Sequence, residues 1–355
     1  MVMPRSSVLL EEAFDWALIA LSAALAAIVV AYWLHAGWTA LYLRLTARTM
    51  ERARRALIDV VSGRASRATV ADLHRLSAAQ KIRLFREFSP SLDGAQRRLL
   101  MTAATDLGVL KVAERRARSR RWTRRLQGVR LFTLLGGGEA IVPRLMFDRR
   151  PEVRAQAAEW ASEHPSEDTI AALLSLLGDD IEFCRFSAKD ALLRLGGVAV
   201  APLKEFLMSN SGPAVQEGLE VAAGLAGPYF LEPSLLHCES RSPRVRGLAA
   251  ILIGGIGGAE EIQRLTSMLG DDDPGVRAAA ARSLGKLGHW PAAPGLARLL
   301  RDRSFAVRRE AALALRALGS PGLIYLHRAV LDEDRFAADM ARQVLDLPET
   351  SAFAG

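Results

Sequence analysis

The chain has 355 residues, of which 47 are Lys or Arg and 39 are Asp or Glu, so its formal net charge is +8. This moderate excess permits contact with anionic lipid or nucleic acid but requires neither. Half of the residues are hydrophobic and only 6% are aromatic, which is typical of stacked helices whose small side chains allow close packing. The two cysteines, Cys184 and Cys238, provide no disulfide framework and fit a reducing compartment.

Residues 16–43 contain no Asp, Glu, Lys or Arg. At about 1.5 Å per helical residue, this stretch is longer than the ~30 Å hydrocarbon layer of a bilayer. Aromatic residues of the kind that anchor helices at membrane interfaces lie toward its ends: Trp16, Tyr32, Trp33, Trp38 and Tyr42. We therefore predict one transmembrane helix, about residues 16–34, with an interfacial extension to residue 43.

Two other interpretations fit this stretch less well. A cleaved signal peptide needs a basic start and a shorter apolar region, whereas residues 1–15 contain Glu11, Glu12 and Asp15. A helix buried in a solenoid would carry a polar stripe, and residues 16–34 have none beyond Ser22. A membrane anchor remains the favoured interpretation.

The arginines on either side of this stretch predict its orientation. Arg5 alone precedes it, whereas residues 44–55 contain five arginines. Because positive charge stays on the cytoplasmic side, we expect residues 1–15 outside a bacterial inner membrane and the rest of the protein in the cytoplasm. Within the basic juxtamembrane helix and linker of residues 44–69, Arg48, Arg52 and Arg55 share one face. That face is either solvated or in contact with anionic headgroups.

Residues 70–147 read as atypical N-terminal repeats, with helical patterns at 78–88 and 94–108 that would cap an array. Their densest basic run is residues 111–130, which surrounds Trp122. It is a solvated linker helix, a docking face for membrane or protein, or a nucleic-acid footprint with one stacking residue. Arg124 to Gly136 also fit the register of the later repeats, so some of these arginines must serve packing. The basic residues that form the candidate patch here are Arg115, Arg116, Arg118, Arg120, Arg121, Arg124 and Arg125.

Residues 148–347 repeat one short pattern every 30 or 31 residues. Apolar anchors mark it at Val153, Cys184, Val215, Val245, Val276, Val307 and Ala337. A turn residue stands five positions before each anchor, most often Asp, and Pro stands two before in four of the seven. Gly stands twelve after in five of them, where a helix would end in a left-handed residue. A fixed period of this length indicates a solenoid.

The D-x-x-P-x-V-R-x-x-A start and the L-G end, seen from Asp271 to Gly288, resemble the short HEAT repeat shared with phycobilin-lyase-type proteins. The resemblance covers residues 148–347 well and 78–147 loosely. It implies an all-α fold, a right-handed α-solenoid of about eight helical hairpins preceded here by the transmembrane helix. It implies little about activity, because this scaffold serves binding proteins, lyases and DNA glycosylases alike.

In this fold class we expect the second helix of each repeat to line the concave side, so its exposed residues would form a binding groove. The candidate partner-binding residues are Lys204, Arg264, Arg298, Arg301 and Arg328. An arginine also follows the anchor in five repeats, for example Arg277. We expect these arginines to pair with the turn aspartates of their own or the next repeat, because a functional arginine has no reason to recur in step with the fold.

No metal-ligand spacing, phosphate loop or nucleophile motif is present, so we assign no catalytic, cofactor or metal residues. We predict a membrane-anchored scaffold, not an enzyme, that recruits a partner protein. The partner is plausibly a membrane enzyme such as a glycosyltransferase, or a transporter. The alternative is a lyase or nucleic-acid-processing protein that uses residues 111–130. A small-residue face, which includes Ala20 and Ala27, makes a homo-oligomer a further option, and residues 348–355 read as a tail.

Overall fold

The computed structural model describes residues 5–64, 67–88 and 94–348. Within these ranges, side chains are not described for residues 5–24, 40–46, 67–69, 94, 97, 259 and 260. The described residues form helices and turns and contain no strand, so the predicted all-α class is confirmed for them. The chain divides into two compact units, one of residues 1–112 and 134–136 and the other of residues 113–133 and 137–355.

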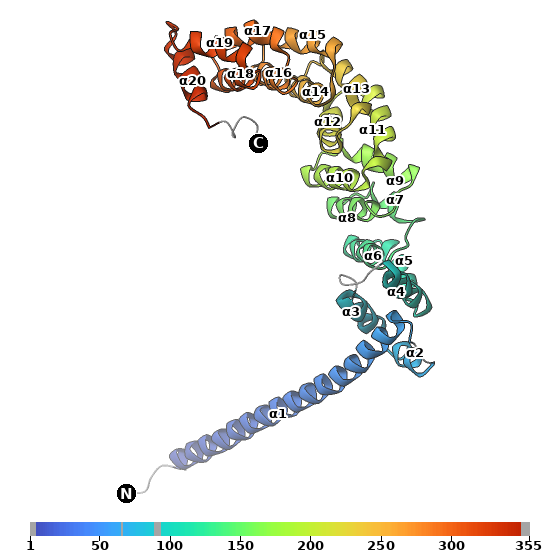
Figure 1. Cartoon of the computed structure of the whole chain (residues 1–355). Coiled ribbons are helices and arrows are strands. Elements are labelled where there is room, and N and C mark those ends of the chain that lie inside the picture. Colours follow the sequence, from blue (N-terminus) through green and yellow to red (C-terminus); the bar gives the residue numbers. More distant parts are fainter. Residues whose placement is uncertain (1–4, 65–66, 89–93, 349–355) are drawn as a thin grey trace. The chain divides into compact units, whose positions relative to one another are not determined.

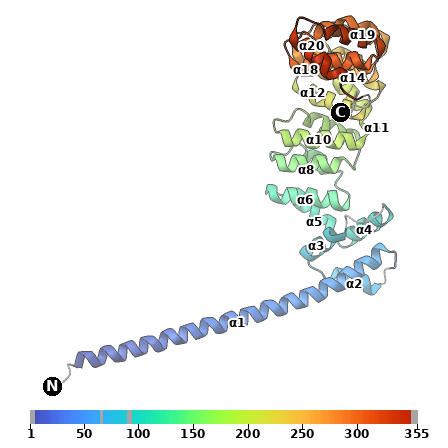
Figure 2. The same ribbon diagram turned by 60° about the vertical axis from the view of Figure 1, so that its left-hand side comes forward.

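The first unit contains one very long helix and three short ones. Helix α1 (Arg5–Val61) is continuous over 57 residues (Figures 1 and 2). It is followed by α2 (Arg67–His74), α3 (Ala78–Phe88) and α4 (Gly94–Asp106). The predicted helical patterns at residues 78–88 and 94–108 are therefore confirmed as α3 and α4. The last turns of α1 are packed into this unit, because Ala53, Leu57 and Val61 are buried and Arg54 bonds to Glu87 of α3 at 2.7 Å.

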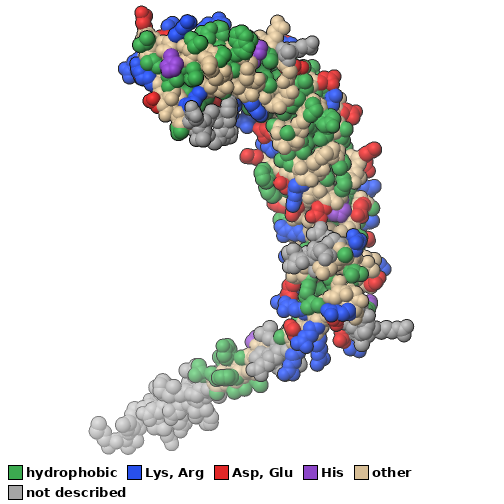
Figure 3. Space-filling model, in the orientation of Figure 1, with side chains coloured by type: hydrophobic (Ala, Val, Ile, Leu, Met, Phe, Trp, Pro, Cys, Tyr) green, Lys and Arg blue, Asp and Glu red, His purple; other side chains and the backbone are tan. Residues whose placement is uncertain are grey.

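The large apolar side chains of α1 between residues 25 and 38 are exposed. Leu25, Ile28, Val30, Trp33 and Trp38 each have more than half of their surface accessible. Figure 3 shows hydrophobic side chains along this part of the helix and Lys and Arg side chains after it. Taking only the residues that the structure describes, no helix is long and apolar enough to cross a membrane. Residues 1–24 and 40–43, including Trp16 and Tyr42, have no described side chains, so these parts of the predicted anchor lie outside the description.

The second unit is a row of helical hairpins. Helix α5 (Val109–Ala117) leads into it. The first helices of the hairpins are α6 (Trp122–Leu135), α8 (Pro151–Ala161), α10 (Glu182–Leu195), α12 (Pro213–Leu225), α14 (Pro243–Ile256), α16 (Pro274–Lys286) and α18 (Phe305–Ala317). The second helices are α7 (Val142–Leu145), α9 (Glu167–Leu176), α11 (Gly197–Ser209), α13 (Leu231–His237), α15 (Ala259–Met268), α17 (Ala293–Leu299) and α19 (Ser320–Ala329). The 3₁₀ turns η2 (Pro228–Phe230) and η3 (Trp290–Ala292) precede α13 and α17, and α20 (Arg335–Leu345) ends the row.

The repeat register predicted from the sequence is confirmed. All seven anchors have no more than 3% of their surface exposed, and the four prolines each begin a helix, as Pro274 begins α16. Four of the five stop glycines have positive φ, among them Gly288 at +66°, where other residues would be strained. Gly257 is the exception, because its φ of −69° is one that any residue adopts.

The predicted side for the second helices is wrong. In Figure 1, α14, α16, α18 and α20 lie on the inner side of the bend in this unit, and α15, α17 and α19 lie on the outer side. The first helices meet through small residues such as Ala280 and Ala311, and Gly254 and Gly285 contact the next helix almost backbone to backbone. Because interaxial distance depends on the side chains at the contact, the alanine-rich helices stack closely and take the inside of the curve.

Candidate partner-binding face

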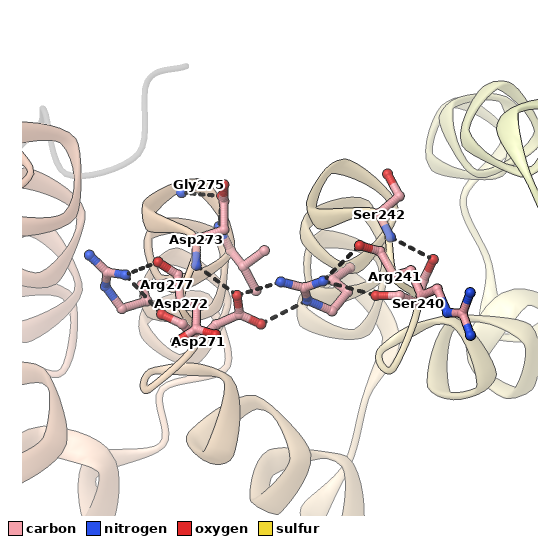
Figure 4. A network of polar contacts seen from close by, with 10 residues as sticks. Ser240, Arg241, Ser242, Asp271, Asp272, Asp273, Gly275 and Arg277 are labelled. Carbon is pink, nitrogen blue, oxygen red and sulfur yellow. Dashed lines mark hydrogen bonds and ion pairs between the residues drawn. The ribbon is translucent and has the colours of Figure 1, made fainter.

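The arginine that follows each anchor fastens neighbouring turns together. Arg277 donates to both carboxylate oxygens of Asp302 in the next turn, at 2.8 and 2.9 Å, and to the carbonyls of Asp271 and Asp272 in its own turn. The Asp271 carboxylate accepts the N–H of Asp273, as Figure 4 shows, and also the guanidinium of Arg246. We call this chain of pairs the arginine ladder. The expectation that these arginines pair with turn aspartates is therefore confirmed for Arg246 and Arg277.

The ladder continues into the basic run. Arg125 bonds to Asp148, and Arg154 bonds to Asp179, with the same two-pronged geometry at 2.6–2.7 Å. These partly buried pairs lower the carboxylate pKa values. For Asp271, the hydrogen bond from Arg246 is the main cause of a pKa below the ordinary range. Arg125 thus serves packing, as its register predicted.

Three positions break the ladder. Arg185 bonds to Glu217 instead of a turn aspartate, because the next turn has Asn210. Helix α12 has Gln216 at the arginine position. Arg308 lacks the expected partner because Arg301 holds Asp332 at 2.9 Å.

Most of the predicted groove residues face the outer side or are already paired. Lys204 bonds to Glu232 at 2.8 Å, Arg264 to Glu239 at 2.6 Å, and Arg301 to Asp332. Arg328 lies 5.9 Å from the Tyr325 ring. Arg298 is exposed on α17. These residues belong to second helices or the turns after them, so the structure does not gather them into an inner groove.

The inner side instead carries a different set of residues. On α16, four exposed or half-buried positions, one before and two, six and ten after the anchor, form one stripe of the helix. We call these positions on α8 to α18 the inner stripe. Between α14 and α18, its charged and large apolar members are Arg244, Ile251, Arg282, Lys286, Arg309 and Leu313. Sequence reasoning missed them because it assigned the wrong helix to the inside, although their spacing was visible in the repeat.

Charge is unevenly distributed along the inner stripe. At α14–α18 it has four cations, of which Arg244 contacts the carboxylate of Glu220, and Arg282 and Arg309 contact that of Glu310. Glu310 has only 7% of its surface exposed and bonds to Arg282 through both oxygens at 3.0 Å. At α8 and α10 the stripe is acidic and aromatic, with Glu152, Glu159, Glu163, Phe183, Phe186, Asp190 and Arg194. This face can therefore bind a partner with acidic groups at one end and basic or apolar groups at the other.

The basic run is not a single linker helix. It contains the end of α5, a turn and the start of α6, which pack on each other so closely that a Cβ on Gly128 would lie 2.5 Å from the Ala117 nitrogen. Arg115, Arg118, Arg120, Arg121 and Arg124 are exposed, and Arg116 is half-buried. Trp122 is half-buried, and the guanidinium of Arg150 lies 5.6 Å from its ring. One stacking face that a nucleobase would need is thus already taken.

Arg48, Arg52 and Arg55, in the predicted juxtamembrane helix, are exposed on α1, and Arg55 is 3.5 Å from Glu51. Tyr32, Trp33 and Trp38 are also exposed. Both cysteines are buried free thiols, and burial raises the pKa of Cys238 to about 11. Over the described residues, no cluster of His, Cys, Asp or Glu has the makings of a metal site.

The repeat geometry agrees with a comparison against protein families. Residues 138–224, 231–316 and 273–346 match the family model described as HEAT repeats, and together they make up more than half of the chain. The chain belongs to the HEAT-repeat proteins. Among curated proteins, none matches it.

Solved structures share this fold at low sequence identity. Importin beta is 14% identical with a TM-score of 0.53, over 82% of this chain and 47% of importin beta. The CpcE–CpcF complex of phycocyanin lyase from Nostoc is 19% identical with a TM-score of 0.31, over 51% of this chain and 99% of that one. Human deoxyhypusine hydroxylase is 20% identical with a TM-score of 0.30, over 68% and 98%. At these identities the likeness extends to the helical-repeat fold alone.

Proposed function

We propose that this HEAT-repeat protein is an interaction scaffold that binds a partner protein along the inner stripe. The observation that carries the proposal is the exposed, charge-separated stripe on stacked, rigid helices. The four cations at α14–α18 outnumber the two carboxylates, Glu220 and Glu310, that three of them contact, so this end attracts acidic segments of a partner. Importin beta is a HEAT-like neighbour whose fold supports a binding role.

The proposal includes attachment to a membrane through α1, with the bulk of the protein on the cytoplasmic side. It is supported by the 28 residues without a charged side chain, 16–43, and by the exposed Leu25, Ile28 and Trp33. Water-exposed apolar side chains of this size on one helix are costly, and lipid would cover them. A tether of this kind raises the effective concentration only of partners at the same surface. The partner we propose is therefore a membrane-associated protein.

The experiment is chemical crosslinking in intact membranes, followed by purification of the full-length protein in mild detergent. The test variant is Arg282→Gln with Lys286→Glu, which changes the local charge by −3 while a glutamine can still donate to Glu310. The matched control is Arg328→Gln with Arg298→Glu, which makes the same charge change on outer helices.

The scaffold proposal predicts that a discrete partner is crosslinked to the wild type and to the outer control but not to the inner variant, with helicity unchanged. Equal recovery with both variants would show that the inner stripe does not bind the partner. Alkaline extraction of the membranes tests the tether, because a protein that α1 anchors in lipid stays in the pellet.

The alternative function, a lyase or nucleic-acid-processing activity through residues 111–130, has less support. Arg125 is committed to Asp148, and Trp122 is covered on one side by Arg150. Six exposed arginines remain in residues 111–130, so binding to DNA at low salt is a direct check. Retention that weakens steeply with salt would favour this alternative.

A further inference from the structure

Six first helices use their ladder arginine in the same way within their own turn. The guanidinium donates to the carbonyl six residues earlier, and in five of the six also to the carbonyl five residues earlier. The six arginines are Arg125, Arg154, Arg185, Arg246, Arg277 and Arg308. Each turn is therefore closed by a cation that satisfies otherwise unpaired carbonyl oxygens.

Helix α12 is the exception. Gln216 stands where the arginine would be, and Ser240 stands in the next turn where an aspartate would receive it. By the same spacing, the carbonyls without a guanidinium are those of Asn210 and Ser211. Neither accepts a hydrogen bond from any residue that the structure describes.

The turn before α12 also has a different conformation. Elsewhere the turn carboxylate accepts the N–H two residues on, as Asp302 accepts that of Ser304. Asn210 instead donates its side-chain amide to the Phe206 carbonyl, and Gly212 adopts a φ of +108° that favours glycine. This turn therefore lacks both the aspartate and the guanidinium that hydrogen-bond to the backbone of the other turns.

A cavity of about 770 Å³ lies at this place. Asn210, Ser211 and Gln216 line one side, and the other side is lined by Leu236, His237, residues 239–242 and Val245. Two charged side chains at its rim, Glu239 and Arg241, are exposed and opposite in sign. His237 is buried, and its Nε2 lies 2.8 Å from the Leu207 carbonyl oxygen.

The groups that remain to recognise a ligand are mostly acceptors. They are the two carbonyl oxygens and the Gln216 amide oxygen, beside the Ser240 hydroxyl, whose oxygen already accepts the N–H of Ser242. A guanidinium is suited to such a set, because it is a planar fork of five donors with no acceptor. The same chain binds a guanidinium at the equivalent position in six other turns.

We propose that this cavity receives an arginine side chain of the partner protein, which takes the place of the ladder arginine that α12 lacks. The proposal rests on the scaffold function, and it adds the chemistry of one contact. The partner would place an exposed arginine between the turns that precede α12 and α14. Its acidic groups would contact the inner stripe. The insertion would close the turn of residues 210–212 as the ladder closes the others.

The test uses N-acetyl-arginine-N-methylamide as the probe and the full-length protein in mild detergent. Saturation-transfer NMR detects weak binding of such a small molecule. The test variant is Gln216→Arg, which supplies the missing guanidinium from the chain itself. The control is Gln343→Arg, which adds the same charge at an exposed position of α20.

The expected result is saturation transfer to the probe from the wild type and from Gln343→Arg, with loss of transfer from Gln216→Arg. Gln216→Arg should also raise the midpoint of thermal unfolding, whereas Gln343→Arg should not. Equal transfer from all three proteins, or none from the wild type, would overturn the proposal. If partner crosslinking depends on Arg282 and Lys286 but the probe does not bind, the scaffold function stands and this site is rejected.

Discussion

Gly254→Ala tests the close approach that makes the first helices the inner ones. A Cβ on Gly254 of α14 would lie 2.3 Å from the Cβ of Ser283 and 2.4 Å from its hydroxyl oxygen on α16. Carbon atoms attract one another best at about 3.5–4.0 Å, so the two helices must move apart by more than about 1 Å. Overpacking of this kind costs about 1–3 kcal/mol, and the hydrogen bond from Ser283 to the Ala250 carbonyl is strained as well.

Gly247, in the same helix, provides the matched control. A Cβ there would meet nothing within 4 Å, so Gly247→Ala should only gain the helix propensity of alanine, about 1 kcal/mol. Because Gly254→Ala gains the same propensity, the two variants should differ in stability by the overpacking cost alone, about 1–3 kcal/mol. Chemical denaturation followed by circular dichroism measures the difference. The double variant Gly254→Ala with Ser283→Gly should recover part of the loss, because the Cβ is then moved from one helix to the other. If Gly254→Ala is as stable as Gly247→Ala, α14 and α16 are not packed as described.

Three further predictions concern the ladder and the thiols. Arg277→Ala removes four hydrogen bonds and leaves Asp302 partly buried without its cation, so it should cost about 2–4 kcal/mol. Arg301→Ala, at an exposed pair, should leave the unfolding midpoint nearly unchanged, and similar losses for both would contradict the assignment of the ladder as structural. The hydrogen bond from Arg246 lowers the pKa of Asp271, so its stabilisation is present above the unfolded pKa of about 3.9 and is lost as the pH falls through the folded pKa. Asp271→Asn should accordingly lower the thermal midpoint at neutral pH, with a deficit that shrinks in acid, and a deficit independent of pH would refute this account. Because burial raises the pKa of Cys238 to about 11, a disulfide reagent should modify it slowly at neutral pH until the protein unfolds, and rapid modification of the folded protein would show that the thiol is accessible.

The sequence was sufficient to predict the repeat because each of its signals acts locally. Proline at the first turn, aspartate in the preceding turn and glycine after the helix each fix a few backbone torsions. Val276, Pro274 and Gly288 therefore have the predicted roles in the structure. The structural role of the repeated arginines was also predictable, since Arg246 and Arg277 recur in step with the turns that they join.

The inner face could not be assigned from periodicity alone. Both helices of a hairpin have an apolar side, and the curvature depends on how closely each set packs on the next repeat. The signal was present in composition: Ala279, Ala280 and Ala281 lie on α16, whereas Leu296 and Leu299 lie on α17. Smaller side chains bring helices closer, so the alanine-rich set should have been placed inside. This error moved the predicted groove from Arg282 and Lys286 to Arg298 and Arg301.

The cavity at α12 lies where one repeat departs from the pattern of the others. In a protein without repeats, nothing would show that an arginine is missing. Here six equivalent turns have an arginine at the position of Gln216. The absence of both halves of the pair, Gln216 for arginine and Ser240 for aspartate, leaves space and acceptors without a donor. A turn that served only packing would gain stability from a restored pair. Gln216 is the one place among these first helices where the guanidinium itself is missing, and a requirement for an open site explains this better than packing does.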